Sequence, residues 1–336
     1  MDRKRSKPLT HRQRMELCLS GDLPDRTPVA LWRHFPVDDQ QADTLAAAHL
    51  NFQRTYDFDF LKVTPASGYF VYDWGVQDEW RGHPHGTREY IGRAIHQPDE
   101  WAKLPLLDPH AGHLAEQLNA VKHLTTALHP DTPVIYTIFT PLSQAKKLVG
   151  DETVIFHLRE HTEQLKKGLE IITESTRRFI KALFEECGID GVFYAVQHAQ
   201  ASLLTPDEYR QFARPDDLAV LEAAKPGWLN LLHLHGEDVY FDLLADYPVQ
   251  IINWHDLETP PNLAEGLKKF PGAVCGGMRQ EETVNLGTAE DVRAEARAAI
   301  QATGGRRFIL GTGCVAPTTT PYGNLMAARQ VVEESN

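Results

Sequence analysis

The chain has 336 residues, of which 42% are hydrophobic and 24% charged, so it can bury a large core in one barrel-sized domain or in two smaller ones. Its formal net charge of −12 disfavours proteins that capture nucleic acid or anionic membrane through a basic surface. The basic start, MDRKRSKPLTHRQR, lacks the apolar run of a secretory signal, and no later stretch nears the roughly 18 apolar residues of a membrane span. We therefore expect a cytoplasmic protein that binds neither nucleic acid nor membrane.

Short apolar segments alternate with amphipathic, helix-like stretches along the chain. The eight strand-like segments are residues 28–35, 57–64, 133–140, 190–197, 228–235, 249–256, 272–278 and 307–314. Of the helix-like stretches, residues 152–188 are expected to end at Gly188, and residues 288–305 to begin at a Thr288 cap. The alternation predicts an α/β fold, and eight strands favour a (β/α)8 TIM barrel. An open doubly wound sheet is the alternative, but its GxGxxG motif is missing.

We expect residues 1–336 to form a single domain with an inserted excursion between the second and third strands. Residues 65–130 are rich in Gly, Pro, Trp and His and are too long for a simple strand-to-helix loop. This excursion is predicted to form a lid over the barrel mouth. Its His83 and His85 lie between Gly and Pro residues and are expected to be solvated.

The active site of such a barrel is built by the loops that follow the strands. Candidate site residues therefore lie at or just after the strand-like segments: Arg33, Lys62, Tyr194, His198, His233, His235, Trp254, His255, Asp256, Arg279 and Cys314. The other cysteines, Cys18, Cys187 and Cys275, are expected to be small buried hydrophobes, because scattered cysteines without a CxxC pair fit reduced thiols.

His233, His235 and Cys314 are the candidate metal ligands. The two histidines lie two residues apart, so on a strand both imidazoles project to the same face. Cys314 ends the sequence GTGC, whose glycines allow a sharp turn that brings the thiol inward. Together they would supply the three protein ligands of a catalytic zinc site. The alternative is that both histidines are hydrogen-bonded residues of the rim that hold no metal.

Charged side chains at the same strand ends are candidates for substrate binding and proton transfer. Arg33 and Lys62 are expected to bind a substrate carboxylate, with salt bridges to Asp57, Asp59 or Asp256 as the alternative.

His255 and Asp256 are expected to orient a ligating imidazole, to bind substrate or to act as acid and base. Tyr194 and Trp254 are expected to line the pocket, and Arg279 to contact substrate.

The sequence resembles the uroporphyrinogen decarboxylase superfamily, whose members are (β/α)8 barrels. The similarity runs from PVALWR at the first strand to GTGCVAPTTTPYGNLMAA at the last, and includes TPLSQAKKLVGD, LLTPDEYRQFARP and HLHGEDVYFDLLADYPVQIINWHD. The decarboxylase itself binds a porphyrinogen through two arginines after strand 1 and an aspartate after strand 2. Arg33 matches the first arginine, but the second falls near Val37 and the aspartate near Thr64.

Two reactions follow from this resemblance. Other branches of the superfamily are zinc-dependent methyltransferases that pass a methyl group between a corrinoid protein and a thiol, with H-x-C after strand 5 and a cysteine after strand 8. His233 and Cys314 match that pattern, while His235 replaces the middle cysteine. The resemblance therefore implies zinc, a small-molecule substrate, a corrinoid protein as partner, and a homodimer.

The alternatives are decarboxylation of a porphyrinogen, carried by Arg33, Tyr194 and His198 without a metal, and a noncatalytic tetrapyrrole- or corrinoid-binding protein. The density of titratable groups at the strand ends disfavours the noncatalytic protein.

Overall fold

The protein has an α/β fold around a seven-stranded parallel sheet, seen in a computed structural model that describes residues 8–334. Residues 1–7, the first half of the basic start, lie outside the described residues. The strands follow one another in the order β1 (Leu61–Val63), β4 (Val134–Phe139), β5 (Gly191–Val196), β6 (Leu231–Leu234), β7 (Ile251–Trp254), β8 (Ala273–Met278) and β9 (Phe308–Thr312). Each one lies within a predicted segment, so seven of the eight predicted strands are confirmed.

The first predicted strand, 28–35, is not a regular strand. It forms a single parallel bridge, between Val29 and Leu310 of β9. The Val29 carbonyl also accepts a hydrogen bond from the backbone N–H of Asp59, just before β1. The segment therefore lies between β9 and the chain leading into β1, but Pro28 has no N–H to donate and the pairing does not continue past Ala30. A complete eight-stranded barrel stays a prediction.

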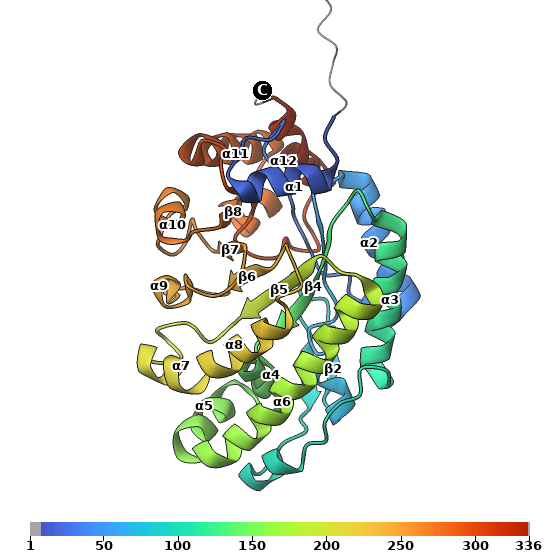
Figure 1. Ribbon diagram of the computed structural model, residues 1–336, viewed down its shortest axis with the longest axis vertical. Coiled ribbons are helices and arrows are strands. Elements are labelled where there is room, and N and C mark those ends of the chain that lie inside the picture. The colour runs from blue at the N-terminus through green and yellow to red at the C-terminus, as the bar shows by residue number, and fades with distance from the viewer. Residues whose placement is uncertain (1–7, 335–336) are drawn as a thin grey trace, which may run out of the picture.

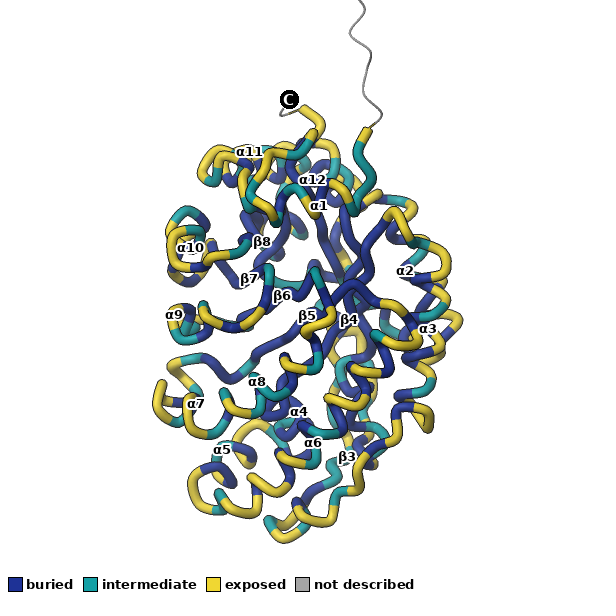
Figure 2. Tube along the Cα trace, viewed as in Figure 1, coloured by how far each residue is buried: buried dark blue, intermediate teal, exposed yellow. Residues whose placement is uncertain are grey.

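Helices cover the outer face of the sheet, and their buried sides face the strands (Figures 1 and 2). They are α1 (His11–Ser20), α2 (Ala42–Tyr56), α3 (Gly112–Leu128), α4 (Pro141–Val149), α5 (Asp151–Glu160), α6 (Thr162–Ala182), α7 (Pro206–Phe212), α8 (Arg214–Ala223), α9 (Phe241–Leu244), α10 (Leu263–Lys269), α11 (Ala289–Thr303) and α12 (Tyr322–Glu334). Shorter helical turns are η1 (Asp38–Gln40), η2 (Tyr72–Trp74), η3 (Pro98–Lys103), η4 (Leu183–Cys187) and η5 (Gln280–Asn285).

Local sequence sets several helix ends. Thr288 caps α11, as predicted, through a hydrogen bond that its hydroxyl accepts from the backbone of Asp291. The predicted helix over 152–188 is broken between α5 and α6, because His161 leaves the helical conformation with φ −131° and ψ 41°. The end of this stretch is confirmed, since Gly188 adopts the left-handed conformation that terminates η4.

The segment 65–130 contains η2, a two-stranded antiparallel sheet of β2 (Gln77–Glu79) and β3 (Glu89–Gly92), η3 and α3. The loop between β2 and β3 is held against the rest of the chain. Arg88 forms ion pairs with Asp39 and Asp78, and the Pro84 carbonyl accepts hydrogen bonds from the backbone N–H and the hydroxyl of Thr318. Whether this segment acts as a lid stays a prediction.

Buried carboxylates tie the chain together at the N-terminal ends of the strands. Asp59, just before β1, is fully buried and accepts hydrogen bonds from Arg14 at 2.7 Å and Arg26 at 2.6 Å, and from the Val29 N–H at 2.7 Å. Asp190, just before β5, accepts from His129 and Trp228, from the Val134 N–H and from Arg12.

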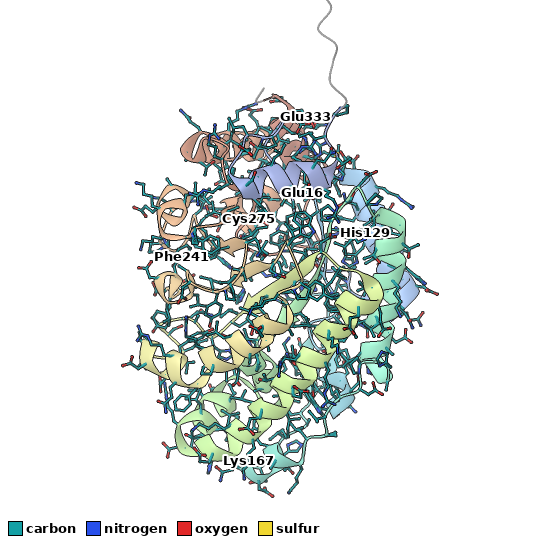
Figure 3. All side chains as sticks on the ribbon, in the orientation of Figure 1. Glu16, His129, Lys167, Phe241, Cys275 and Glu333 are labelled. Atoms are coloured by element: carbon teal, nitrogen blue, oxygen red, sulfur yellow. The ribbon has the colours of Figure 1, made fainter. Side chains whose placement is uncertain are left out.

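The interior is filled by apolar side chains, and all residues of β4, β5 and β8 are buried. Cys275 of β8 lies inside the molecule, whereas Lys167 of α6 lies at its outer surface (Figure 3). Cys18, Cys187 and Cys275 are buried free thiols, as predicted. Within residues 8–334, no helix combines the length and the apolar character needed to cross a membrane.

Candidate metal centre

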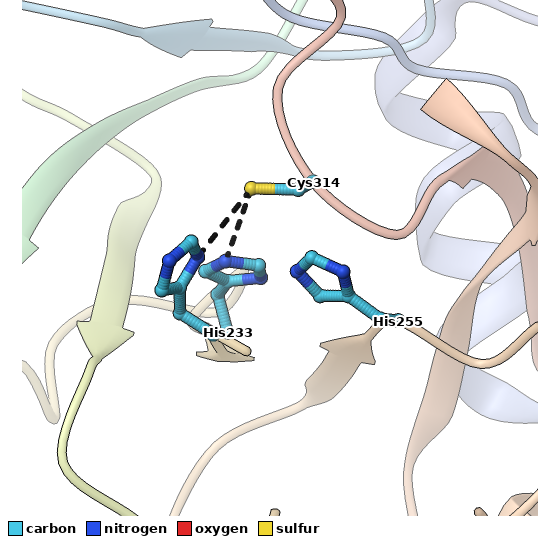
Figure 4. A group of neighbouring side chains, drawn as sticks. His233, His255 and Cys314 are labelled. Carbon is cyan, nitrogen blue, oxygen red and sulfur yellow. Dashed lines mark hydrogen bonds between the residues drawn. The ribbon is translucent and has the colours of Figure 1, made fainter. Parts of the chain in front are cut away.

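Three histidines and one cysteine converge at the C-terminal ends of β6, β7 and β9. His233 lies in β6, His235 directly after it, His255 after β7 and Cys314 after β9. One donor atom from each residue lies within 4.8 Å of the other three. The Cys314 sulfur is 3.7 Å from Nε2 of His233 and 3.6 Å from Nδ1 of His235, with His255 on the other side (Figure 4).

The sequence explains why these side chains meet. His233 and His235 point the same way because residues two apart on a strand share a face. Cys314 reaches them through the chain after β9, which passes very close to the end of β7. A Cβ added at Gly313 would lie 2.8 Å from the Cα of His255, so only glycine permits this approach.

Neighbouring polar groups fix the orientation of two of the imidazoles. The Asn253 Oδ1 accepts a hydrogen bond from Nδ1 of His233 at 2.6 Å, and Glu258 accepts one from Nδ1 of His255 at 2.8 Å. Nε2 of each ring is thereby directed toward Cys314. Nε2 of His255 is buried and has no hydrogen-bond partner among the described residues. A buried ring nitrogen without a hydrogen-bond partner is a candidate ligand for a metal cation.

The electrostatics of the cluster favour a thiolate. Burial disfavours ionisation of Cys314, but the imidazoles of His233, His235 and His255 outweigh it and hold the pKa of this thiol well below its ordinary value. Burial, together with the neighbouring His235 and His255, lowers the pKa of His233, and burial would also lower that of His255. At His255, the hydrogen bonds and negative charges of Cys314 and Glu258 outweigh burial and raise its pKa to about 9.

A cavity of about 160 Å³ opens beside the cluster and is lined by His233, His235 and Cys314. Its other walls include the aromatic rings of Trp32, Phe139 and Phe193 and the polar side chains of His34, Lys62, Thr64, Thr87, Thr137 and Gln197. His85 also lines it and pairs with Glu281, although its side chain is still 38% exposed, and His83 is exposed as expected.

Lys62, which the sequence predicts to bind substrate, lies in the wall of this cavity. It is 5% exposed, and its ammonium contacts the Thr64 hydroxyl at 3.2 Å and lies 4.4 Å from the centre of the Phe193 ring. Burial lowers the pKa of Lys62 to about 7. Neither Lys62 nor Arg33 forms an ion pair with a carboxylate among residues 8–334, so the predicted alternative of salt bridges to Asp57, Asp59 or Asp256 is wrong for both.

Several other predicted site residues lie on the opposite face of their strands. Phe193 and Ala195 of β5 line the cavity, so Tyr194 between them points outward, and its hydroxyl donates to Asp217 of α8 at 2.8 Å. Trp254 likewise points away from His255, packs edge-to-face against Phe241 and donates to the Pro261 carbonyl. The expectation that these two rings line this pocket is therefore wrong, because successive residues of a strand face opposite sides.

Arg33, His198, Asp256 and Arg279 are also absent from the cavity wall. Arg33 donates to the Thr318 carbonyl and lies over the rings of Phe35 and Phe52. His198 is buried beyond β5, and this burial lowers its pKa to about 3.

Asp256 and Arg279 line a separate groove between α10 and α11. There Asp256 accepts from the Gly277 N–H, and Arg279 pairs with Glu295. The catalytic and substrate-binding roles predicted for these residues would therefore require a substrate that contacts the protein outside this cavity. The residues concerned are Arg33, His198, Asp256 and Arg279.

Asn253 and Glu258 were not predicted. Asn253 lies two residues before His255 on the same strand, so its inward position follows from the same alternation that places His233 beside His235. Glu258 sits in the loop after β7, where no periodic signal indicates its direction. His255 was expected to orient a ligand or bind substrate, and the structure instead places its nitrogen among the donor atoms.

A parallel α/β fold with candidate metal ligands at the C-terminal strand ends defines the class of this protein. The chain belongs to the uroporphyrinogen decarboxylase (URO-D) family, which its residues 39–335 match. It is an enzyme of that family.

Two known relatives are methyltransferases. The chain is 26% identical over 214 residues to the methylcobamide:CoM methyltransferase MtaA of Methanosarcina barkeri, and 25% identical over 214 residues to that of strain Fusaro. Each match spans 62% of this chain and 60% of the length of the relative.

Solved structures share the fold. A methyltransferase from Methanosarcina mazei superposes with a TM-score of 0.84 at 18% identity, covering 97% of this chain and 99% of that one. A B12-independent methionine synthase from Shewanella sp. W3-18-1, in complex with selenomethionine, gives a TM-score of 0.56 at 16% identity, covering 95% and 94%.

Proposed function

We propose that this protein is a zinc-dependent methyltransferase that delivers a methyl group to a small thiol. The single observation that carries the proposal is the convergence of His233, His235, His255 and Cys314 within 4.8 Å at the C-terminal strand ends. The distant similarity to methylcobamide:CoM methyltransferases supports the same reaction class.

The donor set fits zinc. Imidazole nitrogen and thiolate sulfur are zinc's usual ligands in proteins, and the hydrogen bonds to Nδ1 of His233 and His255 leave Nε2 of each ring directed toward Cys314. Zinc bound there would replace the proton that His255 holds at neutral pH in its absence. The set has one more member than the three protein ligands of a typical catalytic zinc site. Because His233, His235 and Cys314 line a cavity, a small molecule can reach the cluster, which favours a catalytic over a purely structural role.

Zinc held by these residues would lower the pKa of an incoming thiol and keep it as the thiolate nucleophile at neutral pH. The chain's own residues would bind and orient the acceptor. Trp32, Phe139 and Phe193 would provide apolar walls against which the acceptor packs beside the cluster. Lys62, which has no carboxylate partner among the described residues, would bind an anionic group of the acceptor, such as a carboxylate or a sulfonate.

The cavity disfavours the decarboxylase reaction. Its volume of about 160 Å³ is below the roughly 300–1,000 Å³ of pockets that enclose drug-sized ligands, and a porphyrinogen is larger still. Arg33, the one match to the arginines that bind the porphyrinogen, contacts Thr318 and two phenyl rings on the other face of its segment. A methyl donor as large as a corrinoid would have to reach the cluster from outside, and a separate corrinoid protein is the partner we propose. A homodimer stays a prediction.

Metal analysis and a methyl-transfer assay test the proposal. We expect about one zinc ion per chain in wild-type protein and its loss in Cys314→Ser, whereas Cys187→Ser, which changes a buried thiol far from the cluster, keeps the metal. Zinc-loaded protein should demethylate methylcobalamin in the presence of small anionic thiols, and Lys62→Met should raise KM for these thiols far more than for uncharged ones. Equal zinc content in the two cysteine variants, or no thiol methylation by zinc-loaded protein, would refute the proposal.

A further inference from the structure

Asn253 links the candidate metal centre to three strands of the sheet. It lies in β7, in register with His233 of β6 and Cys275 of β8, and it is fully buried. Its side-chain amide nitrogen donates hydrogen bonds to the carbonyl oxygens of Cys275, at 2.9 Å, and of Thr312 in β9, at 3.0 Å. Both amide hydrogens are therefore used.

These two bonds determine which way the amide faces. A carbonyl oxygen can only accept, so the NH₂ group must point toward Cys275 and Thr312, and Oδ1 must point toward His233. Oδ1 also can only accept, and it lies 2.6 Å from Nδ1 of His233. Nδ1 consequently carries the hydrogen, and Nε2, which lies 3.7 Å from the Cys314 sulfur, carries the unshared electron pair.

We infer that Asn253 is a positioning residue, which makes Nε2 of His233 the metal-binding atom and holds the ring in place. This inference rests on the proposed zinc site. The Phe193 ring, which stacks on His233 with centroids 5.2 Å apart, limits rotation of the imidazole but cannot choose between its nitrogens. Only a hydrogen-bond acceptor behind Nδ1 makes that choice.

Asn253 differs in kind from the acceptor behind His255. Glu258 is a carboxylate in a partly exposed loop, whereas Asn253 is a neutral amide anchored to the backbone of two other strands. The amide fixes the tautomer without adding negative charge beside Cys314. A variant that keeps an oxygen acceptor at position 253 should therefore keep the metal-binding geometry, even if it loses the two bonds to the neighbouring strands.

Asn230 provides a matched control. It is 1% exposed, its amide nitrogen donates to the carbonyls of Ala224 and Gly227, and its Oδ1 accepts from the Val192 N–H. It thus makes as many side-chain hydrogen bonds as Asn253, but it lies just before β6, at the opposite end of the strands from the histidines. Replacing it removes a comparable buried network without touching an imidazole.

The experiment compares Asn253→Leu, Asn253→Asp and Asn230→Leu with the wild-type full-length protein. Zinc affinity is measured by competition with a chromogenic chelator, and the ligand set by the absorption spectrum of the cobalt-substituted protein. We expect Asn253→Leu to weaken zinc binding by about 10- to 100-fold and to change the cobalt bands. Asn253→Asp should stay within a few-fold of wild type, and Asn230→Leu should change neither readout although it is also less stable.

Each outcome bears on the inference. Zinc affinity of Asn253→Leu close to wild type, or an equal loss in Asn230→Leu, would overturn it while leaving the proposed function standing. A wild-type protein that takes up neither zinc nor cobalt would remove both. If Asn253→Leu does not fold, Asn253→Ser replaces it, because a serine hydroxyl is too short to reach Nδ1 and both carbonyls, and the same weakening is expected.

Discussion

The two ends of the parallel strands bury polar groups of opposite kinds. At the N-terminal ends, the oxygens of Asp59 and Asp190 are surrounded by arginine, histidine, tryptophan and backbone donors. At the C-terminal ends, His233, His235, His255 and Cys314 direct donor atoms at one another.

The carboxylate clusters are complete within the chain, because every buried charge has an opposite charge or a donor beside it. The imidazole and thiol cluster instead places three nitrogen atoms and one sulfur atom around one point, an arrangement that a metal cation could occupy in place of a proton. The difference fits a fold in which buried polar groups stabilise one end of the sheet while the loops at the other end carry the candidate ligand-binding groups.

Removing the centre of a completed cluster should have the largest effect. In Asp59→Ala, Arg14 and Arg26 would keep buried positive charges without their shared partner, and the Val29 N–H would lose its acceptor. We expect the free energy of unfolding to fall by about 3–5 kcal/mol in urea denaturation. Asp207→Ala, which removes an exposed partner of Arg210, should cost less than about 0.5 kcal/mol. A similar small loss in both variants would contradict the distinction drawn between the two ends.

The metal cluster should affect stability only when metal is present. Zinc at about 100 times its dissociation constant should stabilise the wild-type protein by about 2.7 kcal/mol. Cys314→Ser should abolish this gain but leave the metal-free protein close to wild type, since the side-chain partners of this thiol are the imidazoles of His233, His235 and His255. Thermal unfolding with zinc and with a chelator measures both quantities, and a large stability loss in the metal-free variant would show that the cluster belongs to the scaffold.

A third buried carboxylate, Asp217, tests how far hydrogen bonds offset the rise in pKa that burial causes. Asp217 is fully buried and accepts from the hydroxyls of Tyr194, Tyr209 and Tyr247, yet burial raises its pKa from 3.8 to about 6.

Between these pH values the folded protein holds a proton that the unfolded chain releases, so the stabilising contribution is present below about pH 4 and is lost as pH rises to about 6. We expect wild type to lose about 2–3 kcal/mol more than Asp217→Asn across this range. Parallel pH profiles of the free energy of unfolding for the two proteins would disprove it.

The smallest effect concerns the acceptor behind His255. Glu258→Gln keeps an oxygen near Nδ1 but removes its charge, and we expect zinc affinity to fall by up to about 10-fold, less than for Asn253→Leu. Glu282→Gln, a change of an exposed glutamate in η5, should leave the affinity unchanged. Chelator competition distinguishes the two, and a larger loss in Glu258→Gln than in Asn253→Leu would reverse the order of importance that the hydrogen bonds indicate.

Much of the site was predictable because strand periodicity is a local property. The alternation that pairs His233 with His235 also explains why Lys62 faces the cavity and why Tyr194, Trp254 and Asp256 do not. The same rule, applied to β7, would have indicated Asn253 and His255 as inward neighbours. By contrast, the direction of Glu258 and the position of His85 depend on loops whose paths are set by contacts with distant parts of the chain.

The fold shows the same division. Seven strand segments were visible as apolar runs between helices. The segment 28–35 has the composition of a strand but forms one bridge, because regular pairing depends on how its neighbours lie and Pro28 removes a donor. The break at His161 depends on how α5 and α6 pack, which amphipathic periodicity does not report.

Part of the loop between β2 and β3 lines the cavity, and this loop is held by the hydrogen bonds from Thr318 to the Pro84 carbonyl and by the pairing of His85 with Glu281. If this loop acts as the predicted lid, a bound molecule would leave the cavity only when these contacts break. The dwell time of an acceptor or its methylated product would then depend on how often two polar contacts release together. Salt and temperature should thus change the turnover rate through their effect on this loop, even where the reaction at the metal is unchanged.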